Sequence, residues 1–294
     1  YKDLPVRYAE IADYNRYEKS GELMGMIRVR KFQLTDAHIF VSQEGLKEEF
    51  KSVCNMIIEG LRGLGFNEIV SYRFSRRDPD NKDKYYPDDN LWNSSESLMK
   101  EALDELGLNY VEAKNEAAFY GPKLDIQAKN VHGKEDTLFT AQIDFLLPEK
   151  FDIHYIDSDS TKKRPVMIHR STIGALERTF AFLIEHYAGN FPLWLSPVQA
   201  VIIPVMETHH ARASEISDLL KSNNIRVELD LSKDGFGKKI RQAKVSRAPY
   251  FIIIGDKDLA VGKATLESNK TKKIGQLTER EILEKLIKEI KERK

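Results

Sequence analysis

The rhythm of apolar residues in the last third of the chain is the feature that most restricts its fold. Short apolar runs, which predict buried strands, alternate with stretches of helical spacing. The strands are expected at 200–205, 225–230, 250–255 and 263–268. The helices are expected at 211–221 and 237–247, and from a capping box at Thr278 through Ile290. Such alternation is typical of a small α/β domain with a mostly parallel sheet.

The first two thirds of the chain follow a different pattern. A helix over 43–63 is indicated by the spacing of Leu46, Phe50, Val53, Ile57 and Leu61, and Gly65 is its expected stop. A strand at 66–74 and a helix at 97–106 come next. Strands at 124–129 and 137–147, joined by a turn near His132, predict an antiparallel hairpin.

Two further segments complete this part. A helix is expected over 170–188, with Ile173, Leu176, Phe180 and Ile184 on its apolar face. Residues 75–95 are polar, contain two prolines and predict a long surface loop or a poorly ordered insertion. The segment 188–199 carries Gly, Asn and two prolines and is the best domain boundary. We therefore expect an α+β antiparallel-sheet domain over 1–193 and a small α/β domain over 194–294.

Composition excludes several classes of protein. The single cysteine, Cys54, rules out a disulfide framework and a multi-cysteine zinc site, and it fits a reducing compartment. The longest apolar runs, Val201–Val205 and Tyr250–Ile254, are too short for a bilayer, and no leader opens the chain, so we expect a cytoplasmic protein. Net charge is zero, but residues 197–294 carry 20 Lys and Arg against 14 Asp and Glu. This excess fits contact with a polyanion, and chance explains it about equally well.

The segment from Asn15 to Phe40 concentrates guanidinium groups. Arg16, Arg28 and Arg30 lie on or near one expected hairpin, and guanidinium forks suit phosphate oxygens. A solvated hairpin with Arg–Glu pairs is the favoured reading of these arginines alone.

Histidines in apolar surroundings are a second candidate feature. His38 and His169 each have apolar neighbours and are candidate zinc ligands, although a single such residue is more often a core histidine. His209 and His210, at the start of an expected helix, are predicted to be surface residues.

Several longer motifs occur together and in order. NRYE with the following RVR strand resembles motif 2 of class II aminoacyl-tRNA synthetases, and GALER resembles the end of their motif 3. Within that class, DAHIF, AFYGPK, AQIDF and PVMIHRSTIGALERTF resemble threonyl-tRNA synthetases. The resemblance covers essentially the whole chain and implies that the first domain is a class II catalytic domain and the second an anticodon-binding domain.

This resemblance implies that threonine and ATP form threonyl-adenylate, from which threonine passes to tRNA(Thr). Arg16 would then clamp the α-phosphate, while Arg28 and Arg178 would hold the outer phosphates and the adenine face. Glu18 would accept a hydrogen bond from the adenine amino group, and Phe32 would stack on the ring. Lys123, with Arg16 and Arg178, belongs to the implied catalytic set, and Mg²⁺ would accompany ATP.

The resemblance also implies a Zn²⁺ ion that binds the amino nitrogen and the side-chain hydroxyl of threonine. His38 and His169 match two of its ligands, Asp36 would pair with the ammonium, and Tyr120 and Gln142 would line the pocket. The third ligand, a cysteine, would lie upstream of Tyr1, and Cys54 is expected in a helix core instead. Motif 1, which builds the dimer interface of the class, is not recognised in this chain either. We expect a homodimer for the full-length protein, which would contain that motif. Leu34 stands where some members carry a polar residue.

Contacts to tRNA are the least specific part of the resemblance. Asp234, Lys239 and Arg241 are candidate anticodon contacts and equally good candidates for ordinary surface charges. Two other functions stay open: a catalytically silent, synthetase-like tRNA-binding protein, and a related prolyl- or glycyl-type synthetase. His38 and His169 within threonyl-like motifs disfavour the second alternative, and retention of Arg16, Glu18, Arg28 and Arg178 disfavours the first.

Overall fold

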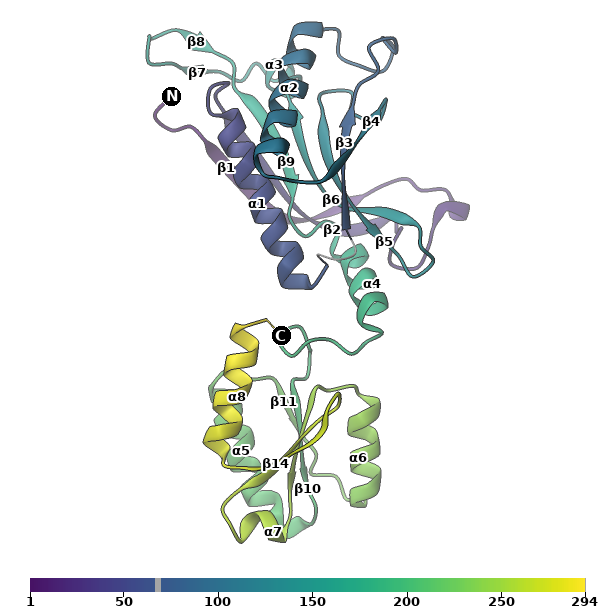
Figure 1. The fold of residues 1–294 in the computed structure, drawn as a ribbon, viewed down its shortest axis with the longest axis vertical. Coiled ribbons are helices and arrows are strands. Elements are labelled where there is room, and N and C mark those ends of the chain that lie inside the picture. Colours follow the sequence, from purple (N-terminus) through teal and green to yellow (C-terminus); the bar gives the residue numbers. More distant parts are fainter. Residues whose placement is uncertain (67–69, 294) are drawn as a thin grey trace. The chain divides into compact units, whose positions relative to one another are not determined.

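The structure, a computed structural model, describes residues 1–66 and 70–293 (Figure 1). They form two compact units, Tyr1–Glu185 and His186–Lys294. The sequence pattern predicted an α+β antiparallel-sheet domain before an α/β domain, and this fold class is confirmed. None of the helices in the described ranges combines the length and the apolar character that a membrane span requires.

The first unit is built on a seven-stranded sheet with the order β1-β2-β9-β6-β5-β3-β4. Every neighbouring pair is antiparallel except β3 and β4, which run parallel. The strands are β1 (Val6–Asn15), β2 (Lys31–Val41), β3 (Val70–Arg76), β4 (Tyr110–Lys114), β5 (Lys123–Lys129), β6 (Glu135–Asp144) and β9 (Val166–Ser171). The expected hairpin is confirmed as the β5–β6 pair, whereas residues 67–69 of the expected strand 66–74 lie outside the described residues.

The central strands of this sheet have one apolar face and one polar face. Ala37 and Ile39 of β2 and Ala141 and Ile143 of β6 are at most 2% exposed, and α1 (Leu46–Leu64) packs against β6 and β9. Residues of alternate parity, such as Asp36 and Gln142, therefore lie on the opposite face. This second face is the one that carries the candidate site.

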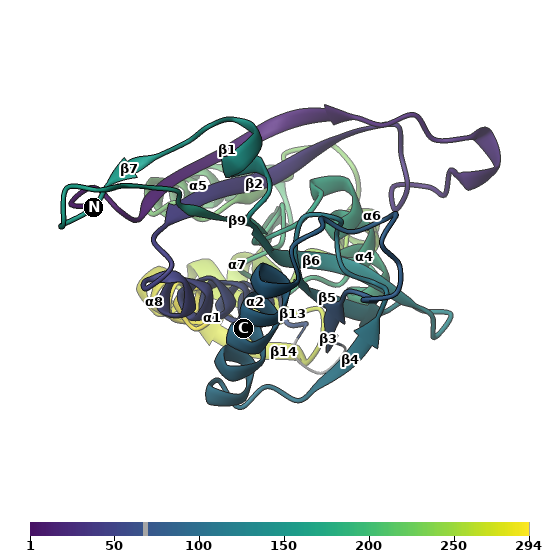
Figure 2. The same ribbon diagram turned by 90° about the horizontal axis from the view of Figure 1, so that it is seen from above.

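Helix α1 forms as its spacing predicts. Its five predicted apolar residues and Cys54 are all buried, and Gly65 ends the helix in the left-handed conformation, with φ 77°. Helix α2 (Asp89–Glu105) runs beside α1 (Figures 1 and 2), and the two are joined by ion pairs from Lys47 and Lys51 to Glu105.

Two local predictions for this unit are wrong. Residues 75–95 are not simply a loop, because α2 begins at Asp89 and Trp92 is fully buried, with Tyr85 and Phe145 packed around it. The expected helix over 170–188 begins only at Leu176, as α4 (Leu176–Tyr187), because the residues up to Ser171 form β9. Its expected core face is on the outside: Phe180 is 54% exposed, whereas Phe182 is buried.

Short elements complete the first unit. They are the 3-10 helix η1 (Ser20–Glu22) between β1 and β2, helix α3 (Leu147–Lys150), and a hairpin of β7 (Tyr155–Ile156) and β8 (Lys162–Lys163).

The second unit is a five-stranded sheet with helices on both faces. Its strand order is β11-β10-β12-β13-β14, parallel for the first three strands and antiparallel for the last two pairs. The strands are β10 (Ala200–Pro204), β11 (Val227–Leu229), β12 (Tyr250–Ile254), β13 (Ala264–Ser268) and β14 (Lys272–Leu277). The helices are η2 (Glu207–His209), α5 (His210–Ser222), α6 (Phe236–Val245), α7 (Asp256–Leu259) and α8 (Glu279–Lys291).

Alternate residues of the central strands pack into two apolar layers, one on each face of the sheet. Ile202 and Ile252 pack with residues of α5 and α8, and Val201 and Phe251 pack with Ala243 of α6. The capping box at Thr278 forms as predicted: its hydroxyl accepts from the Glu281 backbone N–H. Strand β14 was not predicted, so the sheet is less parallel than expected. The surface prediction for His209 is wrong, because this side chain is fully buried.

Candidate active site

The polar face of the first sheet carries a cavity of about 430 Å³. Its walls come from the β1–β2 connection, from strands β2, β5, β6 and β9, and from the start of α4. Ten of the residues predicted for catalysis, ATP, threonine or zinc line it: Arg16, Glu18, Arg28, Phe32, Asp36, Tyr120, Lys123, Gln142, His169 and Arg178. The eleventh, His38, is the strand neighbour of His169.

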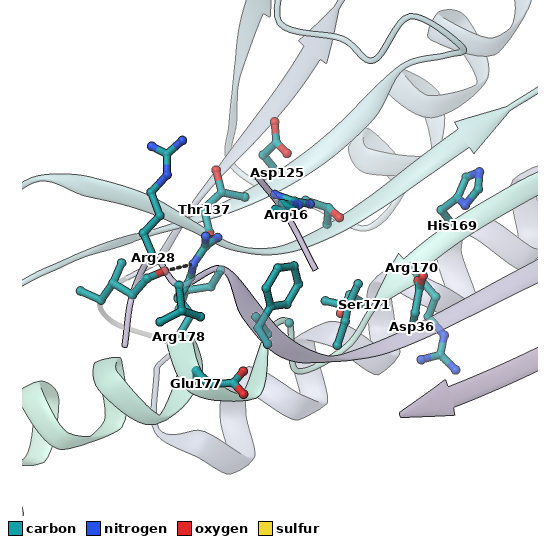
Figure 3. A pocket seen from close by; sticks show the side chains of 18 of the residues that line it. Arg16, Arg28, Asp36, Asp125, Thr137, His169, Arg170, Ser171, Glu177 and Arg178 are labelled. Carbon is teal, nitrogen blue, oxygen red and sulfur yellow. Dashed lines mark hydrogen bonds between the residues drawn. The ribbon is translucent and has the colours of Figure 1, made fainter. Parts of the chain in front are cut away.

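Arg16, Arg28 and Arg178 lie at one end of the cavity (Figure 3). Arg178 is fixed there, because its Nε donates to the Ile27 carbonyl (3.1 Å) and its Nη1 to the Thr137 carbonyl (2.9 Å). The pKa of Arg178 is lowered, first by burial and then by the positive charge of Arg16. Within the described part of the chain, neither Arg16 nor Arg178 has a carboxylate partner. This end of the cavity therefore favours an anion with several oxygens.

Glu18 and Arg28 form an ion pair beside these arginines. Oε2 of Glu18 accepts a hydrogen bond from Nε of Arg28 (3.1 Å) and lies 3.0 Å from its Nη2, and the Glu18 side chain is only 12% exposed. Both groups are thus engaged with each other. A ligand that donates to Glu18 and accepts from Arg28 would compete with this contact.

Phe32 is held in place by its surroundings. Its ring is 8% exposed, stacks on Tyr14 with centroids 6.1 Å apart, and lies 5.3 Å from the guanidinium carbon of Arg16. The next residue, Gln33, donates its backbone N–H to the Glu177 carboxylate at 3.0 and 3.2 Å. Glu177 in the first turn of α4 therefore ties β2 to the helix that carries Arg178.

The other end of the cavity is lined by carboxylate, amide and phenol groups. Tyr14 donates its hydroxyl to Asp36 at 3.1 Å, and Tyr120 donates to the amide oxygen of Gln142. The pKa of Tyr120 is raised to about 12, mainly by burial and next by the charge of Asp144. The pKa of Tyr14 is raised to about 12, again mainly by burial and next by Asp36. Both phenols are hydrogen-bond donors at neutral pH.

Gly121 explains how Tyr120 reaches this position. A Cβ on residue 121 would lie 1.9 Å from the carbonyl oxygen of Ile143, so the backbone passes β6 at a distance that only glycine allows. After this approach, Lys123 begins β5 and its ammonium pairs with Asp125 at 2.8 Å. Asp125 is 2% exposed and also accepts from the Ser75 hydroxyl at 2.7 Å.

The two candidate metal-ligating histidines are neighbours. His38 of β2 and His169 of β9 are register partners, with ring centroids 4.7 Å apart and planes at 80°. His169 Nε2 lies 2.7 Å from Oδ2 of Asp144. No set of three or more His, Cys, Asp or Glu side chains in the described ranges is placed to hold a metal ion. Two imidazoles, one oriented by a carboxylate, fit two positions of a tetrahedral zinc site, whose other ligands would come from elsewhere.

Comparison with known proteins agrees with this arrangement. Residues 1–187 match the family model of the tRNA synthetase class II core domain (G, H, P, S and T), and residues 199–290 match that of the anticodon binding domain. The crystal structure of the RNA binding domain of threonyl-tRNA synthetase from Cryptosporidium parvum Iowa II superimposes with a TM-score of 0.89 at 31% identity, covering 98% of this chain and 71% of that one. The chain belongs to the threonyl-tRNA synthetase family.

Sequence relatives carry the same family name. A threonine–tRNA ligase of Clostridium botulinum (strain Eklund 17B / Type B) is 48% identical over 290 residues, which is 99% of this chain and 45% of the relative. One from Staphylococcus aureus (strain Newman) is 47% identical over 295 residues, covering 100% of this chain and 46% of the relative. The chain thus spans about half the length of the curated relatives it matches.

The anticodon-binding domain places its three candidate contacts differently. Arg241 is exposed on α6, and Asp234 accepts from Lys238 at 2.9 Å just before that helix. Lys239 is only 3% exposed, and its ammonium donates to the Asp230 carbonyl at 3.1 Å. A direct contact to a base suits Arg241 and Asp234 better than Lys239, whose burial suits support of the Asp230 loop.

Sequence reasoning missed four residues of this site: Asp125, Asp144, Glu177 and Tyr14. The alternation of side chains along a strand could have identified two of them. Asp125 has the same parity as Lys123 on β5, and Asp144 has the same parity as Gln142 on β6. Their carboxylates therefore face the polar side of the sheet. For Glu177 and Tyr14 the partner lies on another element, which the sequence pattern does not reveal.

Proposed function

We propose that the protein, at its natural length, is a threonine–tRNA ligase that activates threonine with ATP and Mg²⁺ and transfers it to tRNA(Thr). One observation carries this proposal. A single cavity has unneutralised guanidinium groups at one end and Asp36 and His169 at the other (Figure 3), and Gln142 also lines it. Such a cavity suits a ligand with phosphates at one end and an amino acid at the other.

In the first step, a carboxylate oxygen of threonine attacks the α-phosphorus of ATP, and the bond to pyrophosphate breaks. Arg16 would stabilise the charge that grows on the α-phosphate oxygens, with Lys123 nearby. Arg178, with Arg28, would hold the outer phosphates. Phe32, fixed by Tyr14 and by the Glu177 bond to Gln33, would stack on the adenine. In the second step, a ribose hydroxyl of tRNA attacks the threonyl carbonyl carbon and AMP leaves.

ATP binding would compete with the Glu18–Arg28 pair. The pair's hydrogen bond and ion-pair contact engage Glu18, proposed for the adenine amino group, and Arg28, proposed for the phosphates. An incoming adenine donor and phosphate acceptor would replace each partner's lost bond. The exchange therefore leaves neither charge unpaired, which keeps its cost small.

The amino-acid end would select threonine by its polar groups. Asp36, oriented by Tyr14, would pair with the ammonium, and Tyr120 and Gln142 would line the side-chain pocket. His38 and His169 would hold Zn²⁺, which supplies a Lewis-acidic contact for the amine and hydroxyl. A site built for a hydroxyl rejects an isostere without it far more strongly than it rejects a smaller alcohol.

Amino-acid-dependent ATP–pyrophosphate exchange tests this proposal. We expect exchange with threonine, weaker exchange with serine and none with valine, measured on the protein at its natural length. Stimulation by proline or glycine instead would refute the threonyl assignment within the same fold. No exchange with any amino acid, together with retained tRNA binding, would favour the catalytically silent alternative.

A further inference from the structure

Asp144 is a fully buried carboxylate that ends strand β6 behind the candidate metal site. Oδ1 accepts from the backbone N–H groups of Leu146 (2.8 Å) and Leu147 (2.9 Å), at the start of α3. Oδ2 lies 2.7 Å from Nε2 of His169. The two backbone bonds anchor the carboxylate, so its second oxygen has a fixed direction.

The chemistry of this contact sets the proton position on the ring. A carboxylate has only acceptor oxygens, so the ring nitrogen at 2.7 Å must be the donor. A neutral imidazole that carries its proton on Nε2 has its lone pair on Nδ1. His169 lines the cavity and faces the His38 ring edge-to-face. Because the proton is held on Nε2, the lone pair of Nδ1 is available to a ligand.

We infer that Asp144 is a positioning residue that holds His169 as the Nε2–H tautomer, with Nδ1 as its metal-binding nitrogen. The metal part of this inference rests on the proposed function, whereas the tautomer does not. His38 has no comparable support: it makes no hydrogen bond within the described residues. The two histidines are thus unequal, and His169 is the preorganised one.

The second domain contains a matched pair that serves as a reference. His209 is fully buried, its Nδ1 accepts from the Met206 backbone N–H at 3.1 Å, and its Nε2 lies 2.9 Å from Asp256. Because Nδ1 is an acceptor here, His209 is also an Nε2–H tautomer. Its ring signals show what that tautomer looks like in the same sample.

The test is the long-range ¹H–¹⁵N spectrum of the imidazole rings, recorded without metal on the wild type, D144N and D256N. In the wild type, His169 should show the Nε2–H pattern of His209. The amide introduced by D144N keeps an oxygen for the Leu146 and Leu147 bonds and turns its NH₂ toward the ring, so the proton should move to Nδ1. An isosteric Asp-to-Asn change beside a catalytic histidine is known to impose the wrong tautomer in this way. D256N should alter His209 and leave His169 unchanged.

An Nδ1–H pattern for wild-type His169, or a D144N ring unchanged from wild type, would overturn the inference. If D144N does not fold, the wild-type spectrum alone still decides the tautomer. Zinc titration of the protein at its natural length, against a competing chelator, provides the second readout, in which D144N should lose about 10- to 100-fold in affinity and D256N none. Equal zinc affinity in D144N and wild type would refute the positioning role. Absence of zinc binding to a wild type with the Nε2–H pattern would refute the zinc role in the proposed function instead.

Discussion

Replacing Arg178 by alanine removes the most firmly held positive charge of the candidate site. Its guanidinium makes two bonds to backbone carbonyls and lies among the charges of Arg16 and Arg28. Loss of one preorganised group that stabilises transition-state charge lowers rates by about 10²- to 10³-fold, or about 3–4 kcal/mol. We expect a decrease of that size in threonine-dependent ATP–pyrophosphate exchange, with tRNA binding unchanged.

Stability should change much less than activity. Charged hydrogen bonds contribute about 1.5–3 kcal/mol each, but R178A also relieves burial of a cation and its repulsion from Arg16. We therefore expect a net loss of about 1–3 kcal/mol in the free energy of unfolding in urea.

A matched control separates the structural loss from the catalytic one. Arg226 in the anticodon-binding domain likewise donates to backbone carbonyls, those of Trp194 (2.9 Å) and Ser196 (2.8 and 3.0 Å). R226A should lower stability by a similar amount and leave exchange unchanged. Exchange by R178A at the wild-type rate would refute the phosphate role of Arg178.

Three further predictions concern the walls of the cavity. F32L keeps an apolar side chain beside Tyr14 but removes the stacking ring. It should raise KM for ATP by about 5- to 100-fold with a smaller change in kcat, because stacking stabilises bound substrate as well as the transition state. An unchanged KM in steady-state kinetics would argue against adenine stacking there. G121A should destabilise the first unit by more than about 2 kcal/mol in urea unfolding, since its Cβ would lie 1.9 Å from the Ile143 carbonyl. G21A is the control, because a Cβ there meets no atom within 4 Å, and its effect should be much smaller. Equal effects of the two variants would contradict the close approach. Folding raises the pKa of Tyr120 from 10.0 to about 12, so the contribution of the neutral phenol to the free energy of unfolding is complete below pH 10 and is lost as the pH rises toward 12. Y120F should flatten this alkaline decline in the free energy of unfolding. An identical decline in both proteins would show that Tyr120 does not cause it.

Elements with a strong local pattern were predicted well from sequence. Helix α1 follows from five apolar residues at helical spacing and a glycine that adopts a left-handed conformation. The prediction for residues 75–95 was wrong because the local pattern there is weak. The segment's charges and prolines outnumber the few residues that matter, Tyr85 and Trp92, which become buried only against Phe145. In α4 the spacing gave the helix but not its buried side, since Phe180 and Phe182 are equally apolar.

The site could be predicted only as far as the family motifs reached. Local pattern alone favoured a core role for His38 and His169, because their contact depends on the pairing of β2 with β9, two strands far apart in the sequence. The burial of His209 has the same kind of cause, a partner at Asp256. Supporting carboxylates such as Asp125 act through single long-range bonds, which leave no periodic signal in the sequence.

The claim that one cavity receives both ATP and threonine is tested most directly by a non-hydrolysable sulfamoyl analogue of threonyl-adenylate. Calorimetry should show one molecule bound per chain, with ATP and threonine each displaced by it, and binding lost in a variant that lacks Arg16. The valyl analogue should bind much more weakly, because the polar groups at the Asp36 end would lose their hydroxyl partner. ATP that remains bound in the presence of saturating analogue would place the nucleotide elsewhere and contradict the account.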